Sequence, residues 1–193
     1  MLKQFNPAIR ITLFFTILTG IIYPAVVTGL CQLLSRNQAN GSLVSVNGQV
    51  VGSSLLGQNF SKPEYFQPRP SAAGTDGYDP TASGGSNFGP TNQKLINRVK
   101  ASVEKFRKEN PDYSGPVPAD LVTASASGLD PDLSPAATEA QAARIAKSRG
   151  ITLERVSDLV ASSTQERQLG FLGERRVNVL ELNLALDREF PRK

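Results

Sequence analysis

A glycine-rich stretch, SGGSNFGPTNQ at Ser83 to Gln93, comes nearest to residues that could do chemistry. Gly84, four residues, Gly89, Pro90 and Thr91 match the spacing of a phosphate-binding loop, G-x-x-x-x-G-K-[ST], apart from the lysine. Pro90 replaces that lysine and supplies neither a cation nor an N–H. Gly, Pro and Asp interrupt the preceding segment, so the strand that such a loop requires is not expected. We therefore interpret this stretch as the start of a helix, with Pro90 preset for its first turn.

Other residue types that usually carry catalysis are scarce. The 193 residues include no His and one Cys, which excludes Ser/His/Asp triads, intrachain disulfides and Cys/His metal clusters. Asp120, Asp130 and Asp132 are near enough in sequence to form a carboxylate pair, but in this Pro- and Gly-rich setting we expect them to serve turns. Basic and acidic residues are interspersed around a net charge of +4, so no nucleic-acid partner is expected. The chain also lacks a TVGYG-like potassium filter.

The elements that would position these residues are helices and a hairpin. Asn47-Gly48, between SLVSV and QVVGSSLLG, predicts a β-hairpin. One amphipathic helix is predicted from Thr91 to Glu109, ended by Asn110-Pro111. Further helices are predicted from Ser134 to Gly150, after Thr152, and, in preference to a strand, in VNVLELNLALDREF.

The stretch from Ser61 to Asn92 is long, rich in Pro and Gly, and without a regular pattern. Its aromatic residues Tyr65, Phe66, Tyr78 and Phe88 favour order, because disordered segments are poor in aromatics. Long ordered loops are usually functional. Two interpretations stay open: a loop that wraps its own domain, and a docking surface for a partner.

An uncharged segment runs from Ile11 to Leu34. As a helix its 24 residues rise about 36 Å, which is enough to cross a hydrocarbon core of roughly 30 Å. The following residues offer no clean small-residue cleavage site, which favours a retained span over a signal peptide. Inside the span, Gly20, Pro24 and Gly29 either kink the helix or allow close packing on a partner helix.

Lys3 and Arg10 precede the span and Arg36 follows it, with no further cation until Lys62. This distribution predicts a cytoplasmic N-terminus. We therefore expect a cytoplasmic segment at 1–10, a transmembrane helix at 11–34 and one extracytoplasmic α+β domain at 35–193. A membrane-anchored domain without a visible active site is most simply an accessory subunit.

Several blocks together resemble one family along the whole chain. They are Tyr23-Pro24 in the span, GSLV, GSSLLGQNF, YFQPRPSA, SGGSNFGPTN, DLVTASASGLDP and LGERRVNVLELNLALD. The chain resembles the C subunit of the Kdp potassium-transporting P-type ATPase of the bacterial inner membrane. The resemblance implies a complex with a potassium-binding, channel-like subunit and an ATP-hydrolysing P-type subunit, with a small fourth subunit as a further candidate partner.

The resemblance implies no catalytic or metal-binding residue in this chain, and no bound cofactor, because partner subunits handle ATP and potassium. The family is also described as a catalytic chaperone that raises the ATP affinity of the hydrolytic subunit, and SGGS, which echoes the signature loop of ABC transporters, invites that alternative. The predicted topology favours an assembly role instead. The conspicuous residues of the blocks are candidates for docking or for structural roles: Gln58, Asn59, Phe60, Tyr65, Phe66, Arg69, Ser71, Ser83, Gly84, Gly85, Asn87, Gly89, Pro90, Thr91, Asn92, Asp120, Thr123, Ser125, Gly128 and Asp130.

Overall fold

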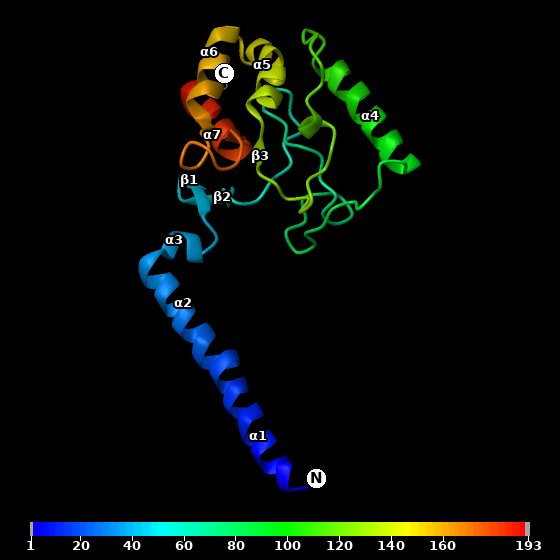
Figure 1. Cartoon of the computed structure of the whole chain (residues 1–193). Coiled ribbons are helices and arrows are strands. Elements are labelled where there is room, and N and C mark those ends of the chain that lie inside the picture. The colour runs from blue at the N-terminus through cyan, green and yellow to red at the C-terminus, as the bar shows by residue number, and fades with distance from the viewer. Residues whose placement is uncertain (1, 192–193) are drawn as a thin grey trace. The chain divides into compact units, whose positions relative to one another are not determined.

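A computed structural model describes residues 2–191, which form two compact units, one up to Ser53 and one from Ser54 onward (Figure 1). The first unit begins with a helical rod made of α1 (Leu2–Ile17), a π-helical turn (Leu18–Ile22) and α2 (Tyr23–Leu34). Among the described residues, Gln4–Leu34 is the one helix that is long and apolar enough to cross a membrane. This agrees with the span predicted from the sequence.

The π-helical turn has a local cause. Pro24 lacks an N–H and its ring would collide with the carbonyl of Gly20 in a regular α-helix. The Tyr23 N–H instead donates to the Leu18 carbonyl, five residues back, which widens the turn next to the proline. A Cβ built on Gly20 or Gly29 would meet no atom within 4 Å. Both glycines therefore face open space in this structure.

A short helix α3 (Arg36–Ala39) leads to the antiparallel pair β1 (Leu43–Val46) and β2 (Gln49–Ser53). The predicted hairpin is confirmed. Asn47 and Gly48 form its turn at φ of 51° and 79°, the positive values that a tight two-residue turn requires.

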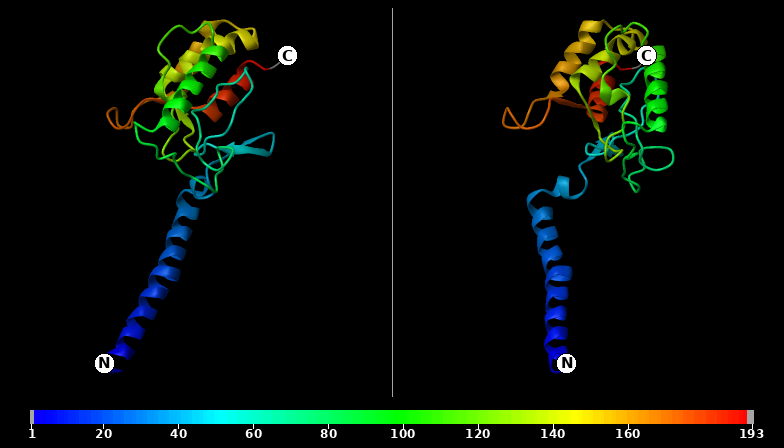
Figure 2. Two further views of the ribbon diagram at one scale, coloured as in Figure 1. Left: turned by 90° about the vertical axis from the view of Figure 1, so that its right-hand side faces the viewer. Right: turned by 45° about the vertical axis from the view of Figure 1, so that its right-hand side comes forward.

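The second unit has an irregular segment followed by four helices and a small sheet (Figure 2). The helices are α4 (Gln93–Glu109), α5 (Pro135–Arg149), α6 (Leu153–Ser163) and α7 (Val179–Glu189), with a 3₁₀ turn at Ala119–Leu121. Three short strands, β3 (Asp132–Leu133), β4 (Thr164–Gln165) and β5 (Arg176–Asn178), pair antiparallel in the order β3-β5-β4. The α+β class expected from the sequence is confirmed, whereas the three-stranded sheet was not anticipated.

The helix boundaries follow from their caps. Ser134 Oγ accepts from the Ala137 N–H, Pro135 takes the first helical position and Gly150 ends α5 at φ 66°, as predicted. The helical interpretation of the C-terminal segment is also confirmed, with Asn178 Oδ1 accepting from the Glu181 N–H. Thr152 stands at the expected N-cap of α6, but its side chain makes no capping bond.

The predicted start of α4 is wrong by two residues. The helix begins at Gln93 and its cap is Asn92, whose side chain accepts from the Lys94 N–H at 2.8 Å. Pro90 therefore does not occupy the first helical turn. It lies in a turn closed by a 3.0 Å bond from the Asn92 N–H to the Gly89 carbonyl, where its fixed φ serves the turn instead.

The core of the second unit lies where α5, α6 and α7 pack on one another and on β5. Its largest fully buried side chains include Ile145, Val156, Leu182 and Leu186, which come from all three helices. Phe66, from the irregular segment, is equally buried. The irregular segment is thus anchored in the core through an aromatic side chain.

Candidate functional site

The segment 54–92 contains most of the candidate residues. Two buried side-chain amides form paired hydrogen bonds with the backbone in its middle, as a neighbouring strand would. Asn183 of α7 accepts from the Phe66 N–H at 2.9 Å and donates to the Phe66 carbonyl at 3.0 Å. Gln141 of α5 does the same for Gln67, at 2.9 and 3.1 Å. Both amides are nearly inaccessible to solvent. They satisfy backbone groups that no sheet partner covers, which lets an irregular chain be buried at low cost.

Arg144 joins three parts of the second unit. Its guanidinium donates to Asn110 Oδ1 at 3.0 Å, to Gln141 Oε1 at 2.8 Å, to the Tyr65 carbonyl at 3.0 Å and to the Pro63 carbonyl. Burial lowers the pKa of Arg144, and the nearby Glu109 carboxylate opposes that shift. Sequence reasoning missed this residue. The available signal was an arginine one helical turn after Gln141, on the face of the helix that carries Ile145.

A second cation, Arg149, contacts the side chain of Tyr65. Arg149 stacks over the Tyr65 ring, with its guanidinium carbon 5.0 Å from the ring centroid, and pairs with Asp187 at 2.8 Å. The Tyr65 hydroxyl donates to the same carboxylate at 2.6 Å. These contacts give Tyr65 a structural role.

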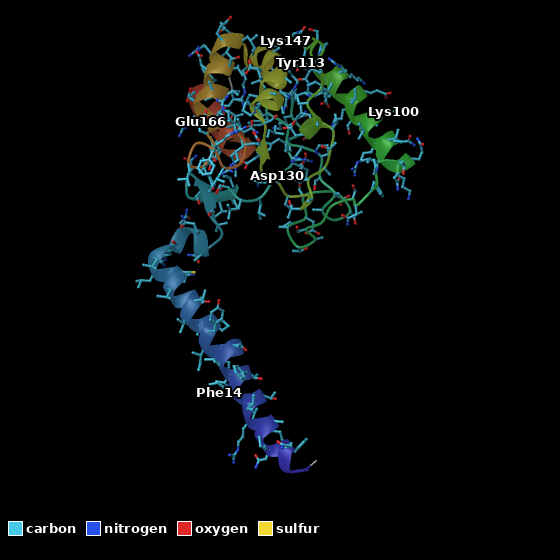
Figure 3. All side chains as sticks on the ribbon, viewed as in Figure 1. Phe14, Lys100, Tyr113, Asp130, Lys147 and Glu166 are labelled. Carbon is cyan, nitrogen blue, oxygen red and sulfur yellow. The ribbon has the colours of Figure 1, made fainter. Side chains whose placement is uncertain are left out.

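The end of the segment that follows Gln67 is bound to the loop 125–130 (Figure 3 labels Asp130 in this loop). Arg69 pairs with Asp130 at 2.7 Å, and the Ser71 hydroxyl donates to the Gly128 carbonyl at 2.6 Å. The Gly84 N–H donates to the Ser127 carbonyl at 2.8 Å. The candidate residues before and within the glycine-rich stretch are therefore brought together with candidates from DLVTASASGLDP.

The expectation that Asp120, Asp130 and Asp132 serve turns is confirmed for Asp130, which accepts from the Asp132 N–H. It is wrong for Asp132, which lies in β3, and Asp120 bonds to a residue 14 positions further along the chain. Asp120 Oδ2 accepts from the Ser134 N–H at 2.8 Å, and the Thr123 hydroxyl donates to the Ala119 carbonyl at 2.6 Å. Ser125 lies 3.4 Å from the Ser127 hydroxyl. The pKa of Asp132 is raised, because the effect of burial outweighs the opposing effect of Arg176 at 3.2 Å.

The glycine-rich stretch is irregular, and residues 54–82, which separate it from β2, contain no strand. Arg98 donates to the Ser86 hydroxyl at 3.1 Å, and its guanidinium carbon lies 5.6 Å from the centroid of the Phe88 ring. Asn87 sits at φ 50°. Gly85 does not have a positive φ, but its built Cβ would lie 3.0 Å from the Ala126 carbonyl oxygen. The close approach of the Ala126 backbone, and not a left-handed conformation, therefore favours a glycine at this position.

A half-open cleft of about 350 Å³ lies between the segment and α4. Asn59 and Phe60 line it together with Asp76, Lys105 and Glu109, and its other walls are mainly amides, hydroxyls and prolines. Tyr78, which also lines it, donates its hydroxyl to the Arg69 carbonyl at 2.5 Å, and burial raises its pKa to about 12. Among the described residues there is no group of three His, Cys, Asp or Glu side chains placed to hold a metal ion. The lining can bind polar groups, and it offers no nucleophile paired with a base.

Comparison with known proteins gives one consistent result. A family model described as "K+-transporting ATPase, c chain" (KdpC) matches residues 5–188. A potassium-transporting ATPase KdpC subunit from Myxococcus xanthus is 57% identical over 98% of this chain and 90% of its own length. The corresponding subunit from Rhodospirillum rubrum is 54% identical over 99% of this chain and 98% of its own length.

Proposed function

The chain belongs to the KdpC family, the C chain of potassium-transporting ATPases, and from this premise we propose that it is a non-catalytic subunit needed for assembly and activity of the pump. In this proposal the potassium-binding, channel-like subunit and the ATP-hydrolysing subunit perform transport and hydrolysis. The chain contributes one membrane span and a docking domain.

One observation carries the proposal. The candidate residues Tyr65, Arg69, Ser71 and Gly84, which follow one another along the irregular segment, bond to the chain's own helices and to the loop 125–130. Because these groups are already hydrogen-bonded within the chain, they fix the conformation of the segment. They support a domain that presents a preformed surface to partners, because an ordered segment loses little conformational entropy on binding.

We propose that the N-terminus is cytoplasmic and that the domain is extracytoplasmic. Lys3 and Arg10 precede the helix Gln4–Leu34 or lie in its first turns, while the only cation between its end and Lys62 is Arg36. Positive residues are retained on the cytoplasmic side of a span. The orientation keeps the domain away from cytoplasmic ATP.

A cysteine introduced at Ser114, which is exposed, should react with a membrane-impermeant thiol reagent on intact spheroplasts. Native Cys31 lies inside the span and should stay unlabelled. The matched control is Gln4→Cys at the opposite end of the helix, which should be labelled only after lysis. Mass spectrometry of the labelled chain measures both sites. Labelling of Ser114→Cys only after lysis would reverse the orientation.

A second candidate function is the catalytic chaperone that raises ATP affinity, favoured by the spacing of Gly84 and Gly89 and by SGGS. In a phosphate cradle the backbone N–H groups and a nearby cation would face the ligand. Here the Gly84 N–H is bonded to Ser127, and Pro90 has no N–H. These features support the assembly role over nucleotide contact.

Pro90→Lys separates the two candidates. If the turn at Gly89–Asn92 is structural, losing the preset φ should cost about 0.5–1 kcal/mol of stability and leave the ATP dependence of the pump unchanged. If the stretch contacts phosphate, the added cation should tighten apparent ATP affinity. ATPase activity of the purified complex is measured against ATP concentration, with Pro80→Lys, in a neighbouring exposed turn, as the matched control. A several-fold tightening for Pro90→Lys alone would contradict the assembly role.

A further inference from the structure

Residues 166–175, hereafter the finger, form a hairpin loop between β4 and β5. In both views of Figure 2 this loop (orange) stands out from the rest of the unit that begins at Ser54. It is nevertheless ordered: Gln165 pairs with Arg176 at its base, and Gln168 pairs with Leu172 near its tip through two 2.9 Å backbone bonds. The finger is therefore a preformed projection.

The tip of the finger is apolar and uncovered. The exposed fractions are 82% for Leu169, 69% for Phe171 and 48% for Leu172. Leu169 and Gly170 lie at φ 53° and 81°, as in a tight hairpin turn whose first position is normally Asn, Asp or Gly. A leucine there is conformationally unfavourable and exposes an apolar side chain to water. Strain combined with an exposed apolar cluster marks a site of contact.

The base of the finger carries four charged side chains, which form two ion pairs. Arg167 pairs with Glu174 at 2.6 Å, and Arg175 pairs with Glu166 at 2.8 Å (Figure 3 labels Glu166). All four charges thus have a partner within the finger. An apolar centre inside a satisfied polar rim is the anatomy of a protein interface. Attraction to an anionic bilayer surface would be strengthened by unpaired cations, whereas both arginines of this rim are paired with glutamates.

We propose that the finger is a docking anchor that inserts Leu169 and Phe171 into an uncharged apolar pocket on another protein subunit of the pump. The inference rests on the proposed function, because it requires an assembled complex. The two apolar side chains would supply most of the contact energy, as buried anchors do in interfaces, and the paired charges would form the rim.

The first test replaces Phe171 with p-benzoyl-phenylalanine in the full chain, expressed with its partner subunits, and irradiates membranes. The expected result is an adduct with one partner subunit, identified by mass spectrometry of the joined peptides. The same photoreactive residue at Leu153, exposed at the start of α6, is the matched control and should give no such adduct.

The second test uses Leu169→Ser and Phe171→Ser, with Leu153→Ser as control. Because both finger side chains are exposed, the thermal stability of the chain should not change. Co-purification of the partner subunits in detergent should fall by about tenfold for the finger variants, as expected for loss of a buried anchor, and stay unchanged for the control.

The outcomes are distinguishable. An adduct with lipid alone would assign the finger to the bilayer and overturn the proposal. No adduct, or equal adducts at Phe171 and Leu153, in a complex that co-purifies normally would overturn the finger's role and leave the proposed function standing. Failure of the wild-type chain to co-purify with any partner would overturn the proposed function, and the docking anchor with it.

Discussion

Replacing Arg144 with Met should lower the free energy of unfolding by about 3–5 kcal/mol, because it removes a buried donor from several neutral acceptors at once. The guanidinium is buried and donates to Asn110 Oδ1, Gln141 Oε1 and the carbonyls of Pro63 and Tyr65. Gln141 Oε1 also accepts from the Gln67 N–H and would keep that partner. Methionine fills much of the volume but donates no hydrogen bond. Each buried acceptor left unpaired costs about 1–3 kcal/mol, and relaxation of the segment recovers part of this sum.

Thermal and denaturant unfolding of the purified full-length chain measures the effect. Arg144→Lys should give an intermediate loss, because an ammonium group retains the charge but not the planar fork that reaches several acceptors. Lys147→Met, one turn further along α5 and exposed (labelled in Figure 3), is the matched control and should change stability by less than about 0.5 kcal/mol. If Arg144→Met and Lys147→Met lost equal stability, the network would not hold the segment.

Helix α5 and its residue Arg144 show which features can be predicted from the sequence and which cannot. Helix α5 was predictable because Ser134, Pro135 and Gly150 act within one turn of its ends. The role of Arg144 was not, because its acceptors Pro63 and Tyr65 are about eighty residues away, at separations of 81 and 79. Local capping can be deduced from neighbouring residues, whereas pairing across the chain depends on packing.

The error at Pro90 arose from an ambiguity in the local sequence, and not from pairing across the chain. A proline with φ near −65° suits both the first turn of a helix and the second position of a β-turn. The cap side chain of Asn92 and the turn bond to the Gly89 carbonyl select the β-turn. For the candidate site, the aromatic residues of the segment 61–92 predicted an ordered segment, and Phe66 is indeed buried in the core. The pairing of Arg69 with Asp130 and of Ser71 with Gly128 could not be deduced from the sequence.

Gly128→Ala should be a strongly damaging change for a single added methyl group, costing about 2–5 kcal/mol. Gly128 lies at φ 70°, and its built Cβ would sit 2.7 Å from both the Ala73 nitrogen and the Gly84 carbonyl oxygen. The left-handed backbone costs an alanine roughly 1–2 kcal/mol, and forcing atoms into a packed site typically adds about 1–3 kcal/mol. The backbone atoms it would meet cannot swing away as a flexible side chain can.

Gly84→Ala is the matched control, because its Cβ would meet no atom within 4 Å and its φ is not in the left-handed region. We expect its stability to stay within about 1 kcal/mol of the wild type. The pair also tests function, since Gly84 is the first glycine of the phosphate-loop spacing and Gly128 packs against the Gly84 backbone. If the stretch is structural, Gly128→Ala should lower the yield of assembled complex several-fold, and complexes that do assemble should keep the wild-type dependence of ATPase activity on ATP. A shift in apparent ATP affinity for Gly84→Ala, at normal stability and yield, would instead favour nucleotide contact at the glycine-rich stretch.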